Sequence, residues 1–240
     1  EAERTAGTGR TRTPVIGVNT RWNLPPVAIG VLMAYAKQYD GGSLDQHYRF
    51  LPDWVASKRT PEAIAPEPSV LLFSNYLWSH RQNLQVCEKV KEHSPHSITI
   101  HGGPDTPNYH GDVEDYFAAN PYVDITVHGE GEITTTELLA RLADRIGDGP
   151  VDLSVLADVP GLSYRDGDTV VHTGSRDRLT DLNVVPSPFL TGLFESYSKV
   201  PEIAVTLETN RGCPYGCTFC DWGSNTKARI RQFDIERVMG

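Results

Sequence analysis

Three of the four cysteines in this sequence lie close together, at Cys213, Cys217 and Cys220. Their spacing is C-x3-C-x2-C, and an apolar run at residues 203–207 leads into them. Three thiolates on one tight loop can hold three irons of a cubane [4Fe-4S] cluster. Because no fourth cysteine lies nearby, one iron is left open to a ligand from outside the protein. The spacing therefore predicts a cluster that binds and reduces a ligand, rather than one that only passes electrons.

Two plainer interpretations of these cysteines remain open. A structural zinc knuckle takes four closed ligands, so Asp221 or a distant histidine would have to complete the set. A partial disulfide set would suit an oxidising compartment, but one clustered loop is not the framework of a small secreted domain. The remaining cysteine, Cys87, falls on the apolar face of an expected helix and is predicted to lie in the core.

The cysteine loop resembles the signature of the radical S-adenosylmethionine (SAM) enzymes. In that family the open iron binds the amino and carboxylate groups of SAM, and electron transfer then yields a 5'-deoxyadenosyl radical. The resemblance implies that Cys213, Cys217 and Cys220 hold the cluster. It also implies that two aromatic residues, Phe219 and Trp222, shape the SAM pocket.

The same resemblance implies that residues 203–240 begin a partial (β/α) barrel, with 203–207 as its first strand. Only twenty residues follow Cys220, enough for a loop and the beginning of a helix capped by Asp234. We expect the rest of the barrel, and the catalytic residues that complete the reaction, to lie outside this sequence. A solvated helix start and helix face are expected to carry the basic side chains Lys227, Arg229, Arg231 and Arg237.

Composition narrows the class of protein. Apolar residues make up 39% and charged residues 22% of 240 residues, which is typical of a globular chain. A net charge of −9 disfavours binding to nucleic acid or to anionic membranes, and no apolar run approaches the length of a membrane span. Residues 1–12 have no apolar signal core and are expected to form a disordered lead-in. Because an Fe–S cluster requires reduced thiols, we expect a cytoplasmic protein.

Upstream of the cysteines, strands alternate with helices. Strands are expected within residues 13–22, 47–51, 69–74, 97–101 and 123–127, and helices at 27–39, 79–93, 113–119 and 133–146, with a loop at 60–68. This alternation predicts the α/β class, with a Rossmann-like open parallel sheet over residues 13–150. A hairpin at 162–172, turning at Asp166-Gly167, and a linker at 173–202 would make up residues 151–202.

Ligands of open parallel sheets lie beyond the carboxyl ends of the strands. Polar or glycine-rich loops follow three of the expected strands, at residues 74–79, 101–105 and 127–132. The pair Gly102-Gly103 would let a ligand approach the backbone closely. These loops are therefore the candidate binding surface of the first domain.

A Rossmann-like domain followed by such a cysteine loop resembles the cobalamin-binding radical SAM family, over nearly the whole sequence. The resemblance implies that the first domain binds cobalamin and turns its cobalt toward the SAM site. Candidate cobalamin contacts are Asn75, Tyr76, Trp78, His101, Gly102, Gly103, Gly129, Glu130 and Gly131. Glu132 could also accept hydrogen bonds from ribose hydroxyls or corrin amides. Structural alternatives stay open for three residues: Trp78 as a rim aromatic, His101 as a satisfied buried histidine, and Glu132 as a first-turn carboxylate.

One familiar cobalamin motif is incomplete. Many cobalamin-binding folds use D-x-H-x-x-G, in which the histidine coordinates cobalt from below. Here Asp45-Gln-His47 has the first part, but Phe50 occupies the glycine position. We therefore do not expect His47 to be a lower ligand. An aromatic ring, Tyr76 or Trp78, would instead pack under the corrin and favour release of a methyl group.

The resemblance implies a cobalamin-dependent radical SAM methyltransferase that uses a [4Fe-4S] cluster, SAM and methylcobalamin to methylate an unactivated carbon. Its substrate would be a small-molecule or peptide natural product, and its reductant an external donor of the flavodoxin or ferredoxin type. No membrane or nucleic-acid partner is expected. Two alternatives remain: a ring rearrangement or cyclisation with the same cofactors, and a cobalamin- or nucleotide-binding module with a structural zinc knuckle.

Overall fold

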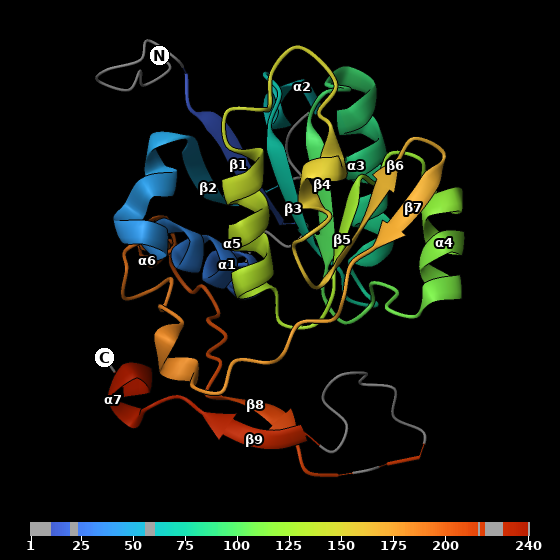
Figure 1. Cartoon of the computed structure of the whole chain (residues 1–240). Coiled ribbons are helices and arrows are strands. Elements are labelled where there is room, and N and C mark those ends of the chain that lie inside the picture. The colour runs from blue at the N-terminus through green and yellow to red at the C-terminus, as the bar shows by residue number, and fades with distance from the viewer. Residues whose placement is uncertain (1–10, 20–23, 56–60, 216, 219–227, 240) are drawn as a thin grey trace.

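The computed structural model describes residues 11–19, 24–55, 61–215, 217–218 and 228–239, and its centre is a seven-stranded sheet (Figure 1). The strands are β1 Thr13–Asn19, β2 Tyr48–Val55, β3 Val70–Ser74, β4 Ile98–Gly102, β5 Ile125–Val127, β6 Leu162–Asp166 and β7 Thr169–His172. Their order is β2-β1-β3-β4-β5-β6-β7; the first five are parallel, and β6 and β7 are antiparallel to their neighbours. The predicted α/β class and the predicted hairpin are confirmed.

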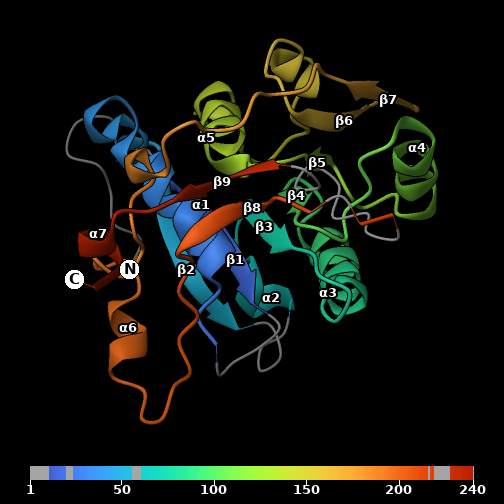
Figure 2. The same cartoon turned by 90° about the horizontal axis from the view of Figure 1, so that it is seen from below.

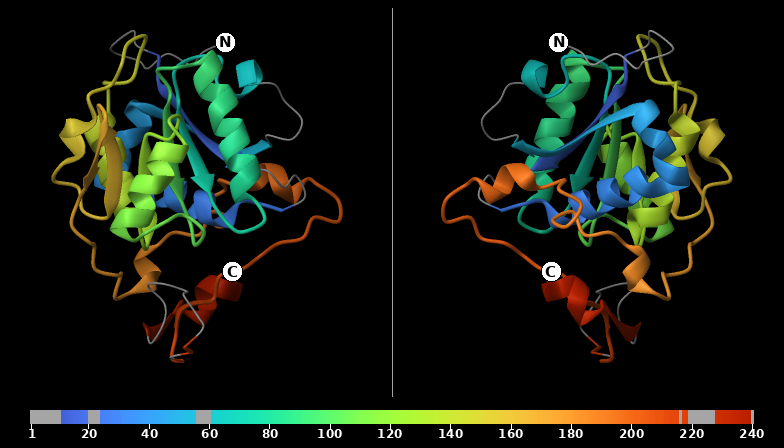
Figure 3. Two further views of the ribbon diagram at one scale, coloured as in Figure 1. Left: turned by 90° about the vertical axis from the view of Figure 1, so that its right-hand side faces the viewer. Right: turned by 90° about the vertical axis from the view of Figure 1, so that its left-hand side faces the viewer.

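Helices cover both faces of this sheet (Figure 3). The long helices are α1 Val27–Gln38, α3 His80–His93, α4 His110–Ala119 and α5 Gly131–Leu142. In β3, Val70 and Leu72 pack with α1 and α5, whereas Leu71 and Phe73 pack with α3 and α4. Because successive side chains of a strand point to opposite faces, a strand buried on both sides is apolar throughout. This explains the unbroken apolar run from which β3 was predicted.

Most element predictions agree with the structure to within a few residues. One expected loop, at 60–68, contains a short helix, α2 Pro61–Ile64, consistent with the preference of proline for the first helical position. Helix α1 ends as expected before Gly41-Gly42, which lie in η1 Tyr39–Gln46 with positive φ angles. Cys87 is completely buried in the α3 side of the core, as predicted.

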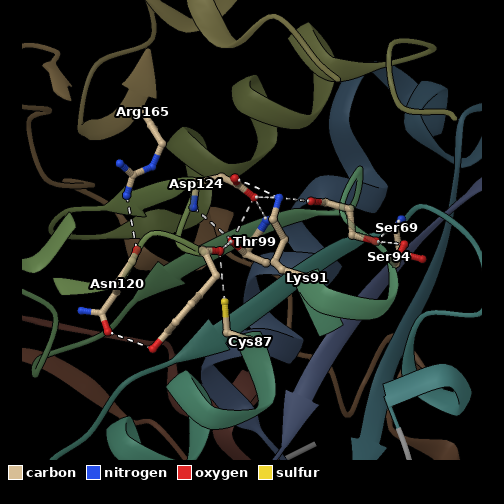
Figure 4. A network of polar contacts seen from close by, with 10 residues as sticks. Ser69, Cys87, Lys91, Ser94, Thr99, Asn120, Asp124 and Arg165 are labelled. Carbon is tan, nitrogen blue, oxygen red and sulfur yellow. Dashed lines mark hydrogen bonds and ion pairs between the residues drawn. The ribbon is translucent and has the colours of Figure 1, made fainter. Parts of the chain in front are cut away.

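A polar network at the amino ends of the strands joins β4 and β5 (Figure 4). The Asp124 carboxylate lies 3.0 Å from the Lys91 ammonium and accepts hydrogen bonds from the backbone amide and hydroxyl of Thr99. Both charged side chains are largely buried. Since ligands of such sheets bind at the carboxyl ends, this pair serves the register of the sheet rather than a ligand.

The segment expected as a linker packs on the first domain. It contains η4 Leu182–Val184 and α6 Glu195–Ser198, and follows η3 Leu153–Leu156. Leu182 and Val185 form an apolar cluster with Val31 of α1 and with Phe233. The ring of Phe194 lies so close to α1 that a Cβ at Gly30 would be 2.2 Å from it. These contacts hold the connecting chain on α1.

The C-terminal part differs from the sequence prediction. Residues 203–207 form no strand, and Val205 and Leu207 are half exposed. Instead, β8 Asn210–Cys213 pairs antiparallel with β9 Ala228–Gln232, and α7 Ile235–Met239 begins directly after Asp234. The first-strand prediction is wrong because an apolar run becomes a sheet strand only beside a partner, and no described strand pairs with it. Since Arg229 and Arg231 belong to β9, they lie on a strand and not on the expected helix.

The predicted lead-in at residues 1–12 falls almost wholly outside the described residues. Within the described ranges, no helix combines the length and the apolar character needed to cross a membrane.

Candidate functional site

The strand order predicts a ligand-binding crevice at the carboxyl ends of β1 and β3. In an open sheet of order 2-1-3-4-5, the connections leave in opposite directions from these two strands, and ligands bind at their carboxyl ends. Strand β1 ends at Asn19 and β3 at Ser74. The loop that begins with Asn75 therefore follows the crevice directly, and the β4 loop at Gly102-Gly103 lies beside it.

Asn75 ties these two loops together. It is completely buried, its backbone amide donates to the Gly102 carbonyl at 2.6 Å, and its own carbonyl accepts from the Asp105 amide at 3.1 Å. Its side-chain nitrogen donates to the Thr106 hydroxyl at 3.1 Å, and its side-chain oxygen accepts from Asn83 at 2.8 Å. Because every polar group of Asn75 has a partner within the protein, this residue shapes the loops rather than contacting a ligand.

Gly103 is required by this arrangement. Its φ angle is +96°, in a region of backbone conformation that residues other than glycine rarely adopt. A Cβ there would lie 2.6 Å from the Asn75 carbonyl oxygen. The glycine pair thus permits the close approach of the β3 and β4 loops and leaves the Gly103 backbone exposed at the crevice edge.

His101 is a buried structural residue in this conformation. Its ring stacks on Phe73 with the centroids 4.4 Å apart, and its Nδ1 lies 3.2 Å from the Asn75 side-chain nitrogen. Burial, together with the nearby His80, lowers the pKa of His101 to about 3. The imidazole is therefore neutral at pH 7, with Nδ1 accepting from Asn75. Of its two alternatives, the structure favours the buried histidine; Nδ1 has a partner in Asn75, whereas the buried Nε2 has no hydrogen-bond partner among the described residues.

The loop that follows β3 carries two neighbouring aromatic rings, Tyr76 and Trp78. Tyr76 and Trp78 stack with centroids 4.9 Å apart and planes inclined by 10°. The Trp78 side chain is 59% exposed, whereas Tyr76 is partly buried. Burial, followed by the negative charge of Glu208, raises the pKa of Tyr76. The pair offers a flat apolar face close to the segment that leads into the cysteines.

The β5 loop is attached to β9 by a bidentate ion pair. The two Nη atoms of Arg231 donate to the two carboxylate oxygens of Glu130 at 2.5 and 3.0 Å, and the Leu179 amide donates to the same carboxylate at 3.1 Å. Arg231 and Glu130 side chains are only 12% and 15% exposed. Burial alone would raise the pKa of Glu130, but hydrogen bonds and the charges of Arg231 and Arg211 hold it below its usual value.

A second link joins the same loop to β8. Arg211 lies 2.6 Å from the Glu132 carboxylate and 2.9 Å from Glu208. Burial opposes the charge of Arg211, yet hydrogen bonds and the charges of Glu208 and Glu132 outweigh it and raise the pKa of Arg211. We call the four side chains Glu130, Glu132, Arg211 and Arg231 the hairpin clasp. Seen from below, β8 and β9 cross the ends of the central strands (Figure 2).

The clasp fixes the strand that carries the first cysteine. Cys213 ends β8, two residues after Arg211, and is partly buried; Cys217 is exposed, and both are free thiols. The predicted cluster ligand Cys220 and the predicted SAM contacts Phe219 and Trp222 lie outside the described residues. Their roles, and the completeness of the cluster site, stay predictions.

The candidate cobalamin contacts fall into two groups. One group gathers at the ends of β3 and β4: Asn75, Tyr76, Trp78, His101, Gly102 and Gly103. The other lies in the β5–α5 turn: Gly129, Glu130 and Gly131. In the second group both oxygens of Glu130 already bind protein groups. Glu132 occupies the first turn of α5, as its alternative required, and pairs with Arg211 as well.

His47 lies far from this edge in the topology. It directly precedes β2, at the amino end of the sheet, and its Nδ1 is 3.0 Å from the Asp144 carboxylate. The expectation that His47 is not a lower cobalt ligand agrees with this position. The sequence analysis missed the role of Arg211 and Arg231. Their only signal was positive charge, because their partners Glu132 and Glu130 lie 79 and 101 positions away.

Comparison with known proteins identifies relatives over most of the chain, although no family model matches it. It is 39% identical over 231 residues to the 2-(S-pantetheinyl)-carbapenam-3-carboxylate methyltransferase of Streptantibioticus cattleyicolor, and 37% identical over 228 residues to the cobalamin-dependent radical SAM methyltransferase TokK of Streptomyces tokunonensis. These matches cover 93% of this chain and 32% of each relative. A more distant relative, 27% identical over 215 residues (86% of this chain and 40% of the relative), is an anaerobic magnesium-protoporphyrin IX monomethyl ester cyclase of Synechocystis. The chain thus spans about a third of the length of the two methyltransferases.

Proposed function

This chain is a homologue of the cobalamin-binding radical SAM enzymes, and we propose that it is the cobalamin- and cluster-binding part of a cobalamin-dependent radical SAM methyltransferase. The observation that carries the proposal is the hairpin clasp. It holds the cysteine-bearing strand β8 against the β5–α5 turn, at the carboxyl edge where the crevice lies. A cluster on the hairpin and a cobalamin at the crevice would then share one edge of the sheet.

The cysteines fit an Fe–S cluster by their donor chemistry. Cys213 and Cys217 are free thiols, and thiolates are the ligands of such clusters. With Cys220 they would supply three ligands and leave one iron for SAM, beside Phe219 and Trp222. When bound, the cluster and SAM supply one-electron reduction and radical chemistry, and cobalamin supplies the methyl group. The chain's own contribution is to fix the position of Cys213 through Arg211.

We propose that the corrin ring of cobalamin binds at this edge of the sheet, where the stacked Tyr76–Trp78 pair and exposed glycine backbone lie. The stacked Tyr76–Trp78 pair would pack under the ring and exclude water from the lower face of cobalt. The exposed backbone of Gly103 and of Gly129 would approach its edge, together with Gly102 and Gly131. His101 and Asn75 would act indirectly by fixing these loops, and Glu130 by holding the hairpin.

The substrate class is proposed from the relatives. One of them is named for a carbapenam carboxylate, which supports methylation of a small molecule. We propose that the methyl acceptor is an unactivated carbon of a small-molecule or peptide natural product. The cluster requires an electron donor, and we propose one of the flavodoxin or ferredoxin type. The cyclase relative supports a second candidate, a cyclisation with the same cofactors.

Anaerobic reconstitution tests the proposal. We expect a brown protein with about four irons per chain, and loss of iron in Cys213→Ala and Cys217→Ala. Cys87→Ala is the matched control and should keep its iron, because Cys87 is a core residue. A colourless protein that holds one zinc instead would overturn the cluster assignment.

Two further measurements separate the remaining alternatives. Added hydroxocobalamin should bind with a corrin absorbance that remains after gel filtration, and failure to bind would refute the crevice assignment. In the complete enzyme, methyl-labelled SAM should transfer its label to the product. An unlabelled, rearranged product would favour the cyclisation instead.

A further inference from the structure

A second group of metal-ligand side chains lies at the outer edge of the sheet, on α4 and β7. His110 and Glu114 are four residues apart on α4 and so share one helix face. His172 ends β7 and faces them: its Nε2 is 3.1 Å from a Glu114 carboxylate oxygen, and its ring centroid is 4.2 Å from that of His110. The potential ligand atoms of all three residues lie within 4.8 Å of one another.

A hydrogen-bonded chain behind His172 fixes the orientation of its ring. The Nδ1 of His172 lies 2.9 Å from the Ser163 hydroxyl oxygen, which lies 2.8 Å from Nε2 of His128. Burial, followed by the neighbouring His172 and His110, lowers the pKa of His128 to about 4. His128 is therefore neutral at pH 7, and its Nε2 can accept the Ser163 hydroxyl proton. Metal-binding histidines are commonly oriented in this way, through their second nitrogen.

We propose that His110, Glu114 and His172 form a binding site for a divalent transition metal ion of the Zn²⁺ type. Two imidazoles and a carboxylate are ligands that zinc accepts, with a fourth position left for water. Zinc–nitrogen bonds of about 2.0–2.1 Å place tetrahedral ligand atoms about 3.4 Å apart. Rotation of the exposed His110 and Glu114 side chains toward the less exposed His172 closes the present spacing.

Metal binding moves the proton of His172 from one ring nitrogen to the other. Without metal, the 3.1 Å contact between His172 and Glu114 is bridged by a proton on Nε2. With metal, that nitrogen presents its lone pair to the ion. The proton moves to the other nitrogen, Nδ1, which donates to the Ser163 hydroxyl oxygen, and Ser163 in turn donates to Nε2 of His128. The bound ion would cross-link α4 to the β6–β7 hairpin.

Calorimetric titration with Zn²⁺ tests the site in the full chain whose cysteines are already occupied by the reconstituted cluster. We expect one zinc ion per chain. His172→Ala should abolish this binding, and Glu114→Gln, a change at an exposed side chain that the fold tolerates, should weaken it at least tenfold. Ser163→Ala, which removes only the orienting hydroxyl, should weaken it by about 10- to 100-fold.

The matched control is His93→Ala, an exposed histidine on α3. It should leave the zinc affinity unchanged, with each variant checked for folding by circular dichroism. Zinc binding that persists at wild-type affinity in Glu114→Gln and His172→Ala would overturn the proposal. So would the absence of any binding beyond the cysteines in the wild-type chain.

Discussion

Replacing Glu130 by Gln weakens the hairpin clasp while keeping the shape of the side chain. Glu130 makes two hydrogen bonds with Arg231, and both side chains are at least 85% buried. Removing one partner of a fully buried ion pair costs about 3–5 kcal/mol. Because the Glu130 and Arg231 side chains keep some solvent exposure, water screens their interaction, and the side-chain carbonyl of the introduced Gln still accepts one hydrogen bond from Arg231. We therefore expect a cost of about 2–3 kcal/mol, localised to the attachment of β8 and β9.

Amide hydrogen exchange measures this loss of local stability directly. A loss of about 2–3 kcal/mol in the free energy of local opening raises exchange rates roughly 30- to 160-fold. The increase should appear in residues 210–213 and 228–232 and not in β3 or β4, which the clasp does not contact. The matched control is Glu195→Gln. Glu195 and its partner Lys199 are both highly exposed, so this substitution should leave the exchange rates of β8 and β9 unchanged.

The outcome that refutes the reasoning is equally specific. Wild-type exchange rates of β8 and β9 in Glu130→Gln would mean that Arg231 does not hold the hairpin. Acid gives an independent check, because the pKa of folded Glu130 lies below its usual value. Its contribution should be complete above about pH 4.3 and lost as the pH falls further, through the lowered pKa of the folded state.

Three further predictions concern other parts of the structure. Between about pH 6 and pH 4 the unfolded chain binds a proton at His101, whereas the folded chain, in which the pKa of His101 is about 3, does not. His101 should therefore lower the free energy of unfolding by about 1.4 kcal/mol for each pH unit of acidification, and the pH dependence measured by urea unfolding should be smaller by that amount in His101→Phe. Asp124→Ala leaves the Lys91 ammonium largely buried without its partner and should cost about 3 kcal/mol, a fall in Tm of roughly 6–12 °C by calorimetry, whereas Asp158→Ala in the exposed pair with Arg141 should cost less than about 1 kcal/mol. Trp78→Ala should weaken hydroxocobalamin binding roughly tenfold in an absorbance titration, as expected for loss of a stacked ring, and Leu77→Ala should not; equal affinities of both variants would remove Trp78 from the crevice.

Local pattern was sufficient to predict the sheet and its loops. The strand at 69–74 was recognisable because both of its faces are buried, so its residues are apolar without interruption. The β6–β7 hairpin was recognisable from Asp166-Gly167 between two short strands. The candidate loop residues followed because the carboxyl ends of parallel strands meet at one edge.

Long-range contacts were not predictable in the same way. Glu130 and Arg231 are 101 positions apart, and nothing in the sequence near either residue specifies the other. The apolar run at 203–207 has the composition of a strand, but strand formation depends on a partner that composition does not supply. The place of His101 at a strand end allowed both a ligand contact and a buried structural histidine, and its stacking on Phe73, visible only in three dimensions, favours the second.

The central claim is that the clasp brings the cysteine hairpin to the cobalamin crevice. Its most direct test is a pulsed electron paramagnetic resonance measurement of the dipolar coupling between the reduced cluster and cob(II)alamin in one reconstituted chain. The account predicts a resolved coupling with one narrow distance distribution, which broadens in Glu130→Gln. A chain that binds both cofactors but shows no coupling between them would contradict it.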